Sequence, residues 1–186
     1  MPGYIGSPKF LVKPSRIHID KRVRIFPGLR AECHGEGRIV ICEDVAIEQD
    51  FHITSMGEIS IGQGTVIAGY VSVTDIEHQY EEIGVPVMRQ PMVMKKTAIG
   101  ANCFIGMGAR IQAGTILGDG CVVGANAVVR GTFPDHSVIV GVPAKIVKQF
   151  NKKNQSWERA QDFDGATGQT FLLPAASIYE GSHRAG

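Results

Sequence analysis

Aliphatic residues recur at every sixth position in the middle of the chain. The series runs through Ile99, Ile105, Ile111, Leu117, Val123 and Val129. The next residue is usually glycine, and the fifth position of each hexad is small. These small residues are Cys103, Ala109, Thr115, Cys121 and Ala127. Six residues are too few for a repeat that contains a helix, but they suit a short strand followed by a tight turn.

The same phase continues upstream in three further sets of three hexads. These sets are Ile19, Ile25, Ala31; Ile41, Ile47, Ile53; and Ile61, Ile67, Val73. The next set starts 10, 8 and 26 positions later, so insertions of four, two and twenty residues each follow a third hexad. Three strands therefore make one triangular coil, and about five coils stack as parallel strands about 4.8 Å apart with their aliphatic side chains inside. We expect glycine at the turns because left-handed backbone angles favour it.

The composition agrees with a turn-rich globular domain. The 186 residues include 23 glycines and 9 prolines, with 44% hydrophobic and 20% charged residues, which suits one folded domain. Nineteen basic against eighteen acidic residues leave a net charge of +1. No strong field therefore attracts nucleic acid or a membrane surface.

The four cysteines indicate a reduced, cytoplasmic protein. Cys33, Cys42, Cys103 and Cys121 form no CxxC motif and have no metal-ligand spacing. Cys103 and Cys121 are eighteen positions apart, so we expect them to stack on adjacent coils as free thiols. We also expect no signal peptide and no transmembrane segment, because the sequence lacks apolar runs of the required length.

The hexads IGANCFIGMGARIQAGTILGDGCVVGANAVV, followed by VGVPAKIV, resemble the hexapeptide-repeat acyltransferases. The resemblance spans about residues 17–148 and implies an all-β, left-handed parallel β-helix. The left hand comes from the resemblance alone, since parallel crossovers are usually right-handed. We expect residues 1–16 to cap the first coil and residues 17–143 to form the β-helix, with a long loop at 75–98. Residues 144–186 are expected to form an α-helix opened by Pro143 and a tail of unassigned role that carries an apolar patch at 171–174.

The long insertion is the expected place for chemistry, because long loops in compact folds are usually functional. It begins with Asp75 and His78, next to a coil corner. His78 is the candidate general base, with Asp75 holding its ring, and Glu77 is a weaker alternative. The apolar stretch at 85–94 is expected to pack on a neighbouring subunit, or alternatively on its own coil.

The segment VTDIEHQY resembles the TDHxH motif of polysaccharide and sugar O-acetyltransferases. Thr74, Asp75 and His78 match the motif, but Ile76 replaces its first histidine and so removes a possible helper near the acceptor. Gln79 stands where the galactoside and maltose branch has proline, which argues against that branch. The resemblance implies that His78 deprotonates a sugar hydroxyl, which attacks the thioester of acetyl-CoA directly in a ternary complex.

The resemblance also implies a homotrimer in which acetyl-CoA lies along the coils between two subunits. Its pantetheine arm would follow backbone groups of Gly106, Met107, Gly124 and Ala125. Arg130 and Lys145 are candidates for the CoA phosphates. Alternatively, these glycines are ordinary turn residues, and the basic residues lie on a solvated charged face.

The acceptor is expected on the coil before the loop. The candidate acceptor residues are Glu48, Asp50, His52 and Ser55. Nothing in these residues separates sugars from other hydroxyl acceptors.

Three other functions use this architecture. One is N-acetylation of an amino sugar or small molecule. Another is a γ-carbonic-anhydrase-like metal enzyme, which needs three histidines. His34 and His52 are eighteen apart, but the insertion between them disturbs their stacking, so no metal is expected. The last is a non-catalytic scaffold, against which Asp75 and His78 argue.

Overall fold

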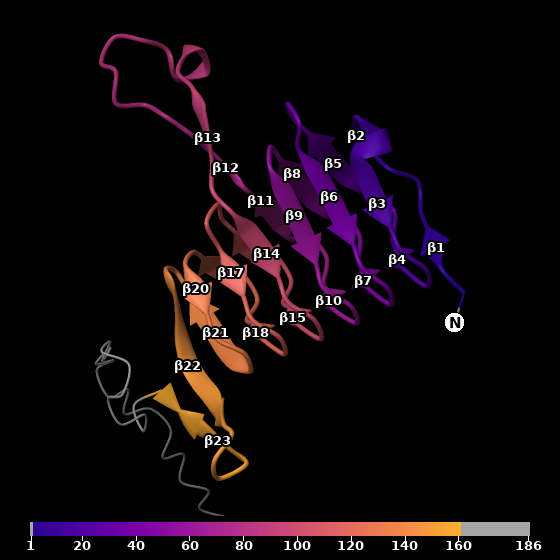
Figure 1. Ribbon diagram of the computed structural model, residues 1–186, viewed down its shortest axis with the longest axis vertical. Helices are drawn as coiled ribbons and strands as arrows, with labels where there is room; N and C mark the ends of the chain where they lie inside the picture. The colour runs from indigo at the N-terminus through magenta and orange to yellow at the C-terminus, as the bar shows by residue number, and fades with distance from the viewer. Residues whose placement is uncertain (1, 161–186) are drawn as a thin grey trace, which may run out of the picture.

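The computed structural model describes residues 2–160, which form a three-sided left-handed parallel β-helix (Figure 1). Each side is a sheet, here called A, B or C. Sheet A contains β1 (Tyr4–Ile5), β4 (Arg24–Ile25), β7 (Ala46–Ile47), β10 (Val66–Ile67), β15 (Phe104–Ile105), β18 (Val122–Val123) and β21 (Ser137–Gly141). Sheet B contains β2 (Phe10–Val12), β5 (Arg30–Cys33), β8 (His52–Ser55), β11 (Ser72–Thr74), β16 (Arg110–Ile111) and β19 (Val128–Val129). Sheet C contains β3 (Ile17–Ile19), β6 (Arg38–Ile41), β9 (Glu58–Ile61), β14 (Thr97–Ile99), β17 (Ile116–Leu117) and β20 (Thr132–Phe133).

The register of the strands confirms the predicted hexad phase. On sheet C, Ile19 pairs with Ile41, Ile41 with Ile61 and Ile61 with Ile99. The corresponding hexad residues also pair along sheets A and B. All three predicted insertions leave from the corner between sheets B and C, where they extend the connection without interrupting a ladder.

The helix has more coils than the five predicted, because both ends add strands. The first strand of sheet A, β1, pairs in parallel with β4, and β2 pairs in parallel with β5. Within residues 2–16, expected as a cap, β1 and β2 thus continue the helix by parallel pairing, and the short 3-10 helix η1 (Pro14–Arg16) follows β2. At the other end, β20 and β21 extend sheets C and A.

Glycine at the second hexad position serves close stacking instead of a left-handed turn. A Cβ on Gly62 would lie 2.4 Å from the carbonyl carbon of Gly100, and one on Gly106 would lie 2.6 Å from the amide nitrogen of Ala125. Positive φ angles occur two residues later, at Gly64 and Gly108. These two corners therefore require a small residue at one position and a left-handed residue at another.

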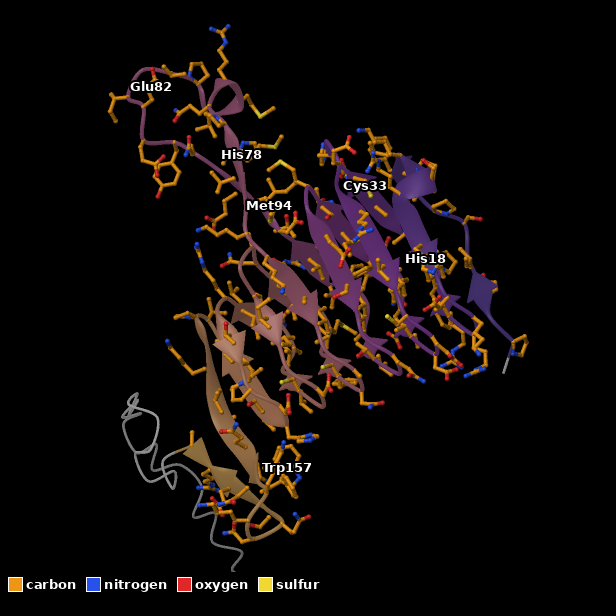
Figure 2. All side chains as sticks on the ribbon, in the orientation of Figure 1. His18, Cys33, His78, Glu82, Met94 and Trp157 are labelled. Atoms are coloured by element: carbon orange, nitrogen blue, oxygen red, sulfur yellow. The ribbon has the colours of Figure 1, made fainter. Side chains whose placement is uncertain are left out.

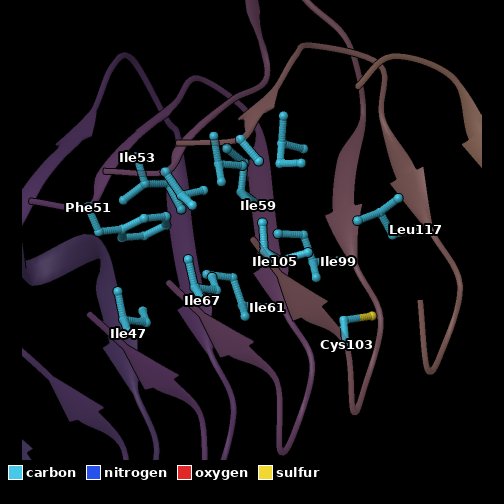
Figure 3. Close-up of a cluster of buried hydrophobic side chains, with 14 of the residues drawn as sticks. Ile47, Phe51, Ile53, Ile59, Ile61, Ile67, Ile99, Cys103, Ile105 and Leu117 are labelled. Atoms are coloured by element: carbon cyan, nitrogen blue, oxygen red, sulfur yellow. The ribbon is translucent and has the colours of Figure 1, made fainter. Parts of the chain in front are cut away.

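The core fills the interior of the triangle (Figure 3). Ile61, Ile67 and Ile105 are fully buried, and Phe51 is the largest fully buried side chain among residues 2–160. All four cysteines are free, as predicted; Cys33, Cys103 and Cys121 lie in the interior, whereas Cys42 is half-buried. Cys103 Sγ donates to the carbonyl of Gly118 at 3.3 Å.

The predicted C-terminal α-helix is wrong, because residues after Pro143 form a strand. β22 (Ala144–Asn151) pairs antiparallel with β21, and β23 (Ser156–Arg159) pairs with β22. Ile146 and Phe150 fit a helical stripe, but they also lie on the same face of a strand, because an even number of positions separates them. Pairing with the open edge of sheet A decides between the two patterns. The apolar patch at 171–174 lies outside the described residues.

An arm projects from the corner between sheets B and C (Figure 1). We use this name for residues 76–94, which contain β12 (Ile76–His78), the 3-10 helix η2 (Val87–Arg89) and β13 (Met92–Met94). The amide of Gln90 ties the tip together: its Nε2 donates to the carbonyls of Glu82 and Val85 at 3.1 and 2.9 Å. Across residues 2–160, no helix has the length and apolar character needed to cross a membrane.

Candidate functional site

Asp75 fixes the corner from which the arm leaves. Its carboxylate is fully buried and accepts hydrogen bonds from Ser55 Oγ at 3.0 Å and from the backbone N–H groups of Met56 and Gly57 at 2.8 and 2.9 Å. Three donors therefore hold one carboxylate at the end of β11. A carboxylate suits this position because it accepts hydrogen bonds at both oxygens and donates none.

The structure does not bring Asp75 to His78, contrary to the expected pairing. Asp75 follows Val73 on the inward side of the coil, so its carboxylate faces Ser55 inside the corner. Within residues 2–160, neither a hydrogen bond nor an ion pair joins it to the imidazole of His78. Asp75 thus holds the root of the arm, and no described side chain orients the ring of His78.

His78 lies on the arm, outside the coils. It ends β12, opposite Met92 of β13, and its side chain is exposed. Figure 2 shows His78 and Met94 near the base of the arm and Glu82 farther out. An imidazole in this position can meet a ligand or another protein surface without moving the coil.

Glu77 connects the arm to the later coils, a role that sequence reasoning missed. Its carboxylate lies 2.5 Å from Lys95 Nζ and 2.5 Å from a terminal nitrogen of Arg130. Arg130 follows β19, whose Val129 is aligned with Val73 through Ile111. The strand register could have indicated that Arg130 lies close to the root of the arm. Arg130 is therefore engaged with the arm, where the resemblance implied contact with CoA phosphates.

The candidate pantetheine residues occupy a different corner, between sheets A and B. Gly106–Met107 and Gly124–Ala125 stack on adjacent coils there, and Asn126 N donates to the Met107 carbonyl at 2.8 Å. Coil stacking requires Gly106, as described above, and a Cβ on Gly124 would lie 2.9 Å from a methyl carbon of Val140. Lys145 lies on β22 instead of the expected helix.

The four candidate acceptor residues do not converge. Glu48 and Asp50 lie at the corner between sheets A and B, where Asp50 forms an ion pair with Lys9. His52 lies on the outer face of sheet B. Ser55 is buried and bonded to Asp75.

His52 belongs to a polar cluster whose other members sequence reasoning did not single out as a group. Glu32 Oε1 accepts a hydrogen bond from Arg30 Nε at 2.6 Å and lies 3.3 Å from His52 Nε2. Thr54 Oγ1 lies 3.0 Å from the same nitrogen. Burial alone would raise the pKa of Glu32, but the bonds and charges of Arg30 and His52 together outweigh it and lower that pKa. Only the register of β5 and β8 places these residues together.

Comparison with known proteins supports the fold and the class of enzyme. Residues 96–131 match the family model described as bacterial transferase hexapeptide (six repeats). The putative lipopolysaccharide biosynthesis O-acetyl transferase WbbJ of Escherichia coli K12 is 36% identical over 163 residues, covering 84% of this chain and 83% of WbbJ. No group of three or more His, Cys, Asp or Glu residues suited to a metal ion occurs in the described part of the chain.

Two solved structures share the architecture. The N-acyltransferase AntD from Bacillus cereus superposes with a TM-score of 0.65 at 19% identity, over 82% of this chain and 86% of AntD. A galactoside acetyltransferase in complex with coenzyme A gives a TM-score of 0.62 at 20% identity, over 88% of this chain and 74% of that one. At these identities the likeness concerns the fold alone.

Proposed function

Because this chain belongs to the bacterial hexapeptide-repeat acetyltransferases, we propose that it transfers an acetyl group from acetyl-CoA to a sugar hydroxyl of a surface polysaccharide or its precursor. The similarity to WbbJ along most of both chains supports a glycan acceptor. The free thiols favour the cytoplasm as the place of action.

His78 is the proposed general base, and its placement is the observation that carries the proposal. Imidazole can accept a proton near neutral pH, and this imidazole is exposed on a rigidly rooted arm. His78 would take the proton of the acceptor hydroxyl as the oxygen attacks the thioester carbonyl. The thiolate of CoA would then leave and carry the electron pair of the broken C–S bond.

The A–B corner fits the pantetheine arm of acetyl-CoA, which supplies the activated thioester. Gly106, Gly124 and Ala125 keep side chains small along two adjacent coils, so that a ligand can approach the backbone closely. Exposed Met107 adds an apolar surface beside them. Lys145 remains a proposed contact for the nucleotide phosphates.

The proposed site requires more than one copy of the chain. His78 leaves from the B–C corner, whereas the candidate pantetheine residues lie at the A–B corner of the two coils that follow the arm. The arm exposes apolar side chains, including Ile83 at 94% and Met88 at 85%. A neighbouring copy that covers the arm would bring its own A–B corner toward His78, in agreement with a homotrimer.

The test is a free-thiol assay for CoA release over a panel of glycosides, sugar nucleotides and amino sugars. The wild type should release CoA with a glycoside or sugar nucleotide, and His78→Ala should abolish this release. His18→Ala is the matched control, because His18 is also exposed but lies on the face of sheet C. Near-wild-type turnover by His78→Ala contradicts the proposed base, and turnover confined to amino sugars with a free amine indicates N-acetylation.

A further inference from the structure

The outer face of sheet B carries a recessed carboxylate surrounded by donors and an aromatic ring. We call Phe10, Arg30, Glu32, His52 and Thr54 the Glu32 cluster. The guanidinium of Arg30 lies 5.3 Å from the centroid of the Phe10 ring. Strand pairing aligns Phe10 with Arg30 and His52, and Glu32 with Thr54. Three adjacent strands therefore build one continuous polar surface with an apolar edge.

One oxygen of Glu32 is held, and the other is open. Oε1 is bonded to Arg30 and lies near His52, as described above. Oε2 accepts no hydrogen bond from residues 2–160, and its ion-pair neighbour, His34 Nε2, is 3.6 Å away. The terminal amino groups of Arg30 likewise donate no hydrogen bond within this range. The cluster thus presents a fixed acceptor and free donors side by side.

A second Arg–Glu pair shows that a recessed carboxylate is not a general property of the coils. Arg38 and Glu58 form an ion pair between adjacent strands on sheet C. The side chain of Glu58 is 46% exposed, whereas that of Glu32 is 11% exposed. A surface pair such as Arg38–Glu58 remains solvated, while the recessed carboxylate of Glu32 is held in one orientation.

We propose that the Glu32 cluster binds a pyranose ring of the acceptor, with Glu32 and Arg30 hydrogen-bonded to neighbouring hydroxyls. A sugar hydroxyl can donate to Glu32 Oε2 while its neighbour accepts from Arg30, and the apolar face of the ring can lie against Phe10. Thr54 offers a further hydroxyl. The assignment of this sugar as the acceptor rests on the proposed function.

The location of the cluster supports this role. Glu32 and Thr54 share an outward-facing row with Thr74, which directly precedes the root of the arm. At the usual strand spacing, Glu32 lies about 10 Å from Thr74 along the helix. A sugar on the Glu32 cluster is thus held on the side of the helix from which the arm and His78 emerge.

Direct binding tests the site without requiring catalysis. The probes are the methyl glycosides of glucose, galactose, mannose and rhamnose, together with UDP-glucose, and UDP alone as the control. Saturation-transfer NMR and calorimetric titration would use the full chain as wild type, His78→Ala, Glu32→Gln, Thr54→Val and Glu58→Gln. Comparing the glycosides with UDP-glucose distinguishes a free sugar from a nucleotide-linked one.

We expect at least one sugar probe to bind the wild type, and we expect His78→Ala to weaken that binding less than Glu32→Gln does, because it leaves the Glu32 cluster intact. Glu32→Gln should weaken that binding about tenfold, because the sugar hydroxyl then meets a neutral amide instead of a charged carboxylate. Thr54→Val should weaken it less, and Glu58→Gln should leave it unchanged. If Glu32→Gln does not fold, Thr54→Val decides, since it replaces a part-exposed hydroxyl with a methyl group of similar size.

The inference is overturned if no sugar probe binds the wild type, or if UDP alone accounts for the binding. It is also overturned if Glu32→Gln binds the sugar as the wild type does, or, where Glu32→Gln does not fold, if Thr54→Val does so. These failures are distinct from failure of the proposed function. Sugar binding without CoA release would leave the site in place and remove the enzyme reaction. If Glu32→Gln releases CoA with an unchanged acceptor KM, the enzyme reaction stands and the proposed sugar site does not.

Discussion

The carboxylate of Glu77 lies 2.5 Å from the guanidinium of Arg130, so a residue beside the candidate base is tied to a coil more than fifty positions later. Lys95, which directly follows the returning strand of the arm, pairs with the same carboxylate. Because the side chains of Glu77 and Arg130 are partly exposed, their pairing contributes little to folding. Its main consequence is the direction in which the arm presents His78.

Arg130→Ala should lower kcat more than it changes the KM for acetyl-CoA. Losing the tie to Glu77 lets the arm turn, and a small misplacement of a catalytic group can cost about tenfold or more in rate. The measurement is steady-state kinetics with both substrates varied, and Arg38→Ala on sheet C is the control. A raised KM for acetyl-CoA with unchanged kcat would instead assign Arg130 to the phosphates of CoA.

Asp75→Ala should destabilise the protein by about 3 kcal/mol or more. The substitution leaves Ser55 Oγ and two backbone N–H groups without their buried acceptor, and each such loss costs about 1–3 kcal/mol. Urea unfolding followed by circular dichroism measures the change. Glu36→Ala serves as the control, since the exposed pair of Glu36 with Arg16 should contribute less than about 1 kcal/mol. Equal midpoints for the two variants would show that Asp75 does not hold the corner.

The stability that Glu32 contributes should disappear in acid. Its folded-state pKa is lowered below its ordinary value of 4.5, so the contribution is present above about pH 4.5 and is lost as the pH falls through the lowered value. Arg30, His34 and His52 surround the carboxylate. The difference in unfolding free energy between the wild type and Glu32→Gln should therefore shrink as the pH falls below about 4.5. A difference that stays constant over this range would show that Glu32 is not stabilised as an anion.

The hexad pattern predicted the coils because each inward position must hold an apolar side chain that fills the interior. Ile61 and Ile99 could be aligned across the twenty-residue insertion, since both fill the same ladder. The partners of Asp75 could not be predicted, because Met56 and Gly57 contribute only backbone groups. The hexad register placed Arg130 near the root of the arm, but it did not predict the ion pair of Arg130 with Glu77. The strand at 144–151 was missed for another reason. Ile146 and Phe150 fit the period of a helix as well as that of a strand, and pairing with the open edge of sheet A favours the strand.

The apolar tip of the arm gives the last prediction, which concerns assembly. Met88→Glu should convert the proposed trimer to a smaller species, because it buries a charge where the exposed arm would meet a neighbouring copy. Sedimentation velocity measures the change, and CoA release should fall with it if the site is shared between copies. Ile5→Glu is the control, since Ile5 is also exposed and apolar but lies on β1, away from the arm (Figure 1). A trimer that survives Met88→Glu would place the contact between copies elsewhere, and an active monomer would show that one chain completes the site.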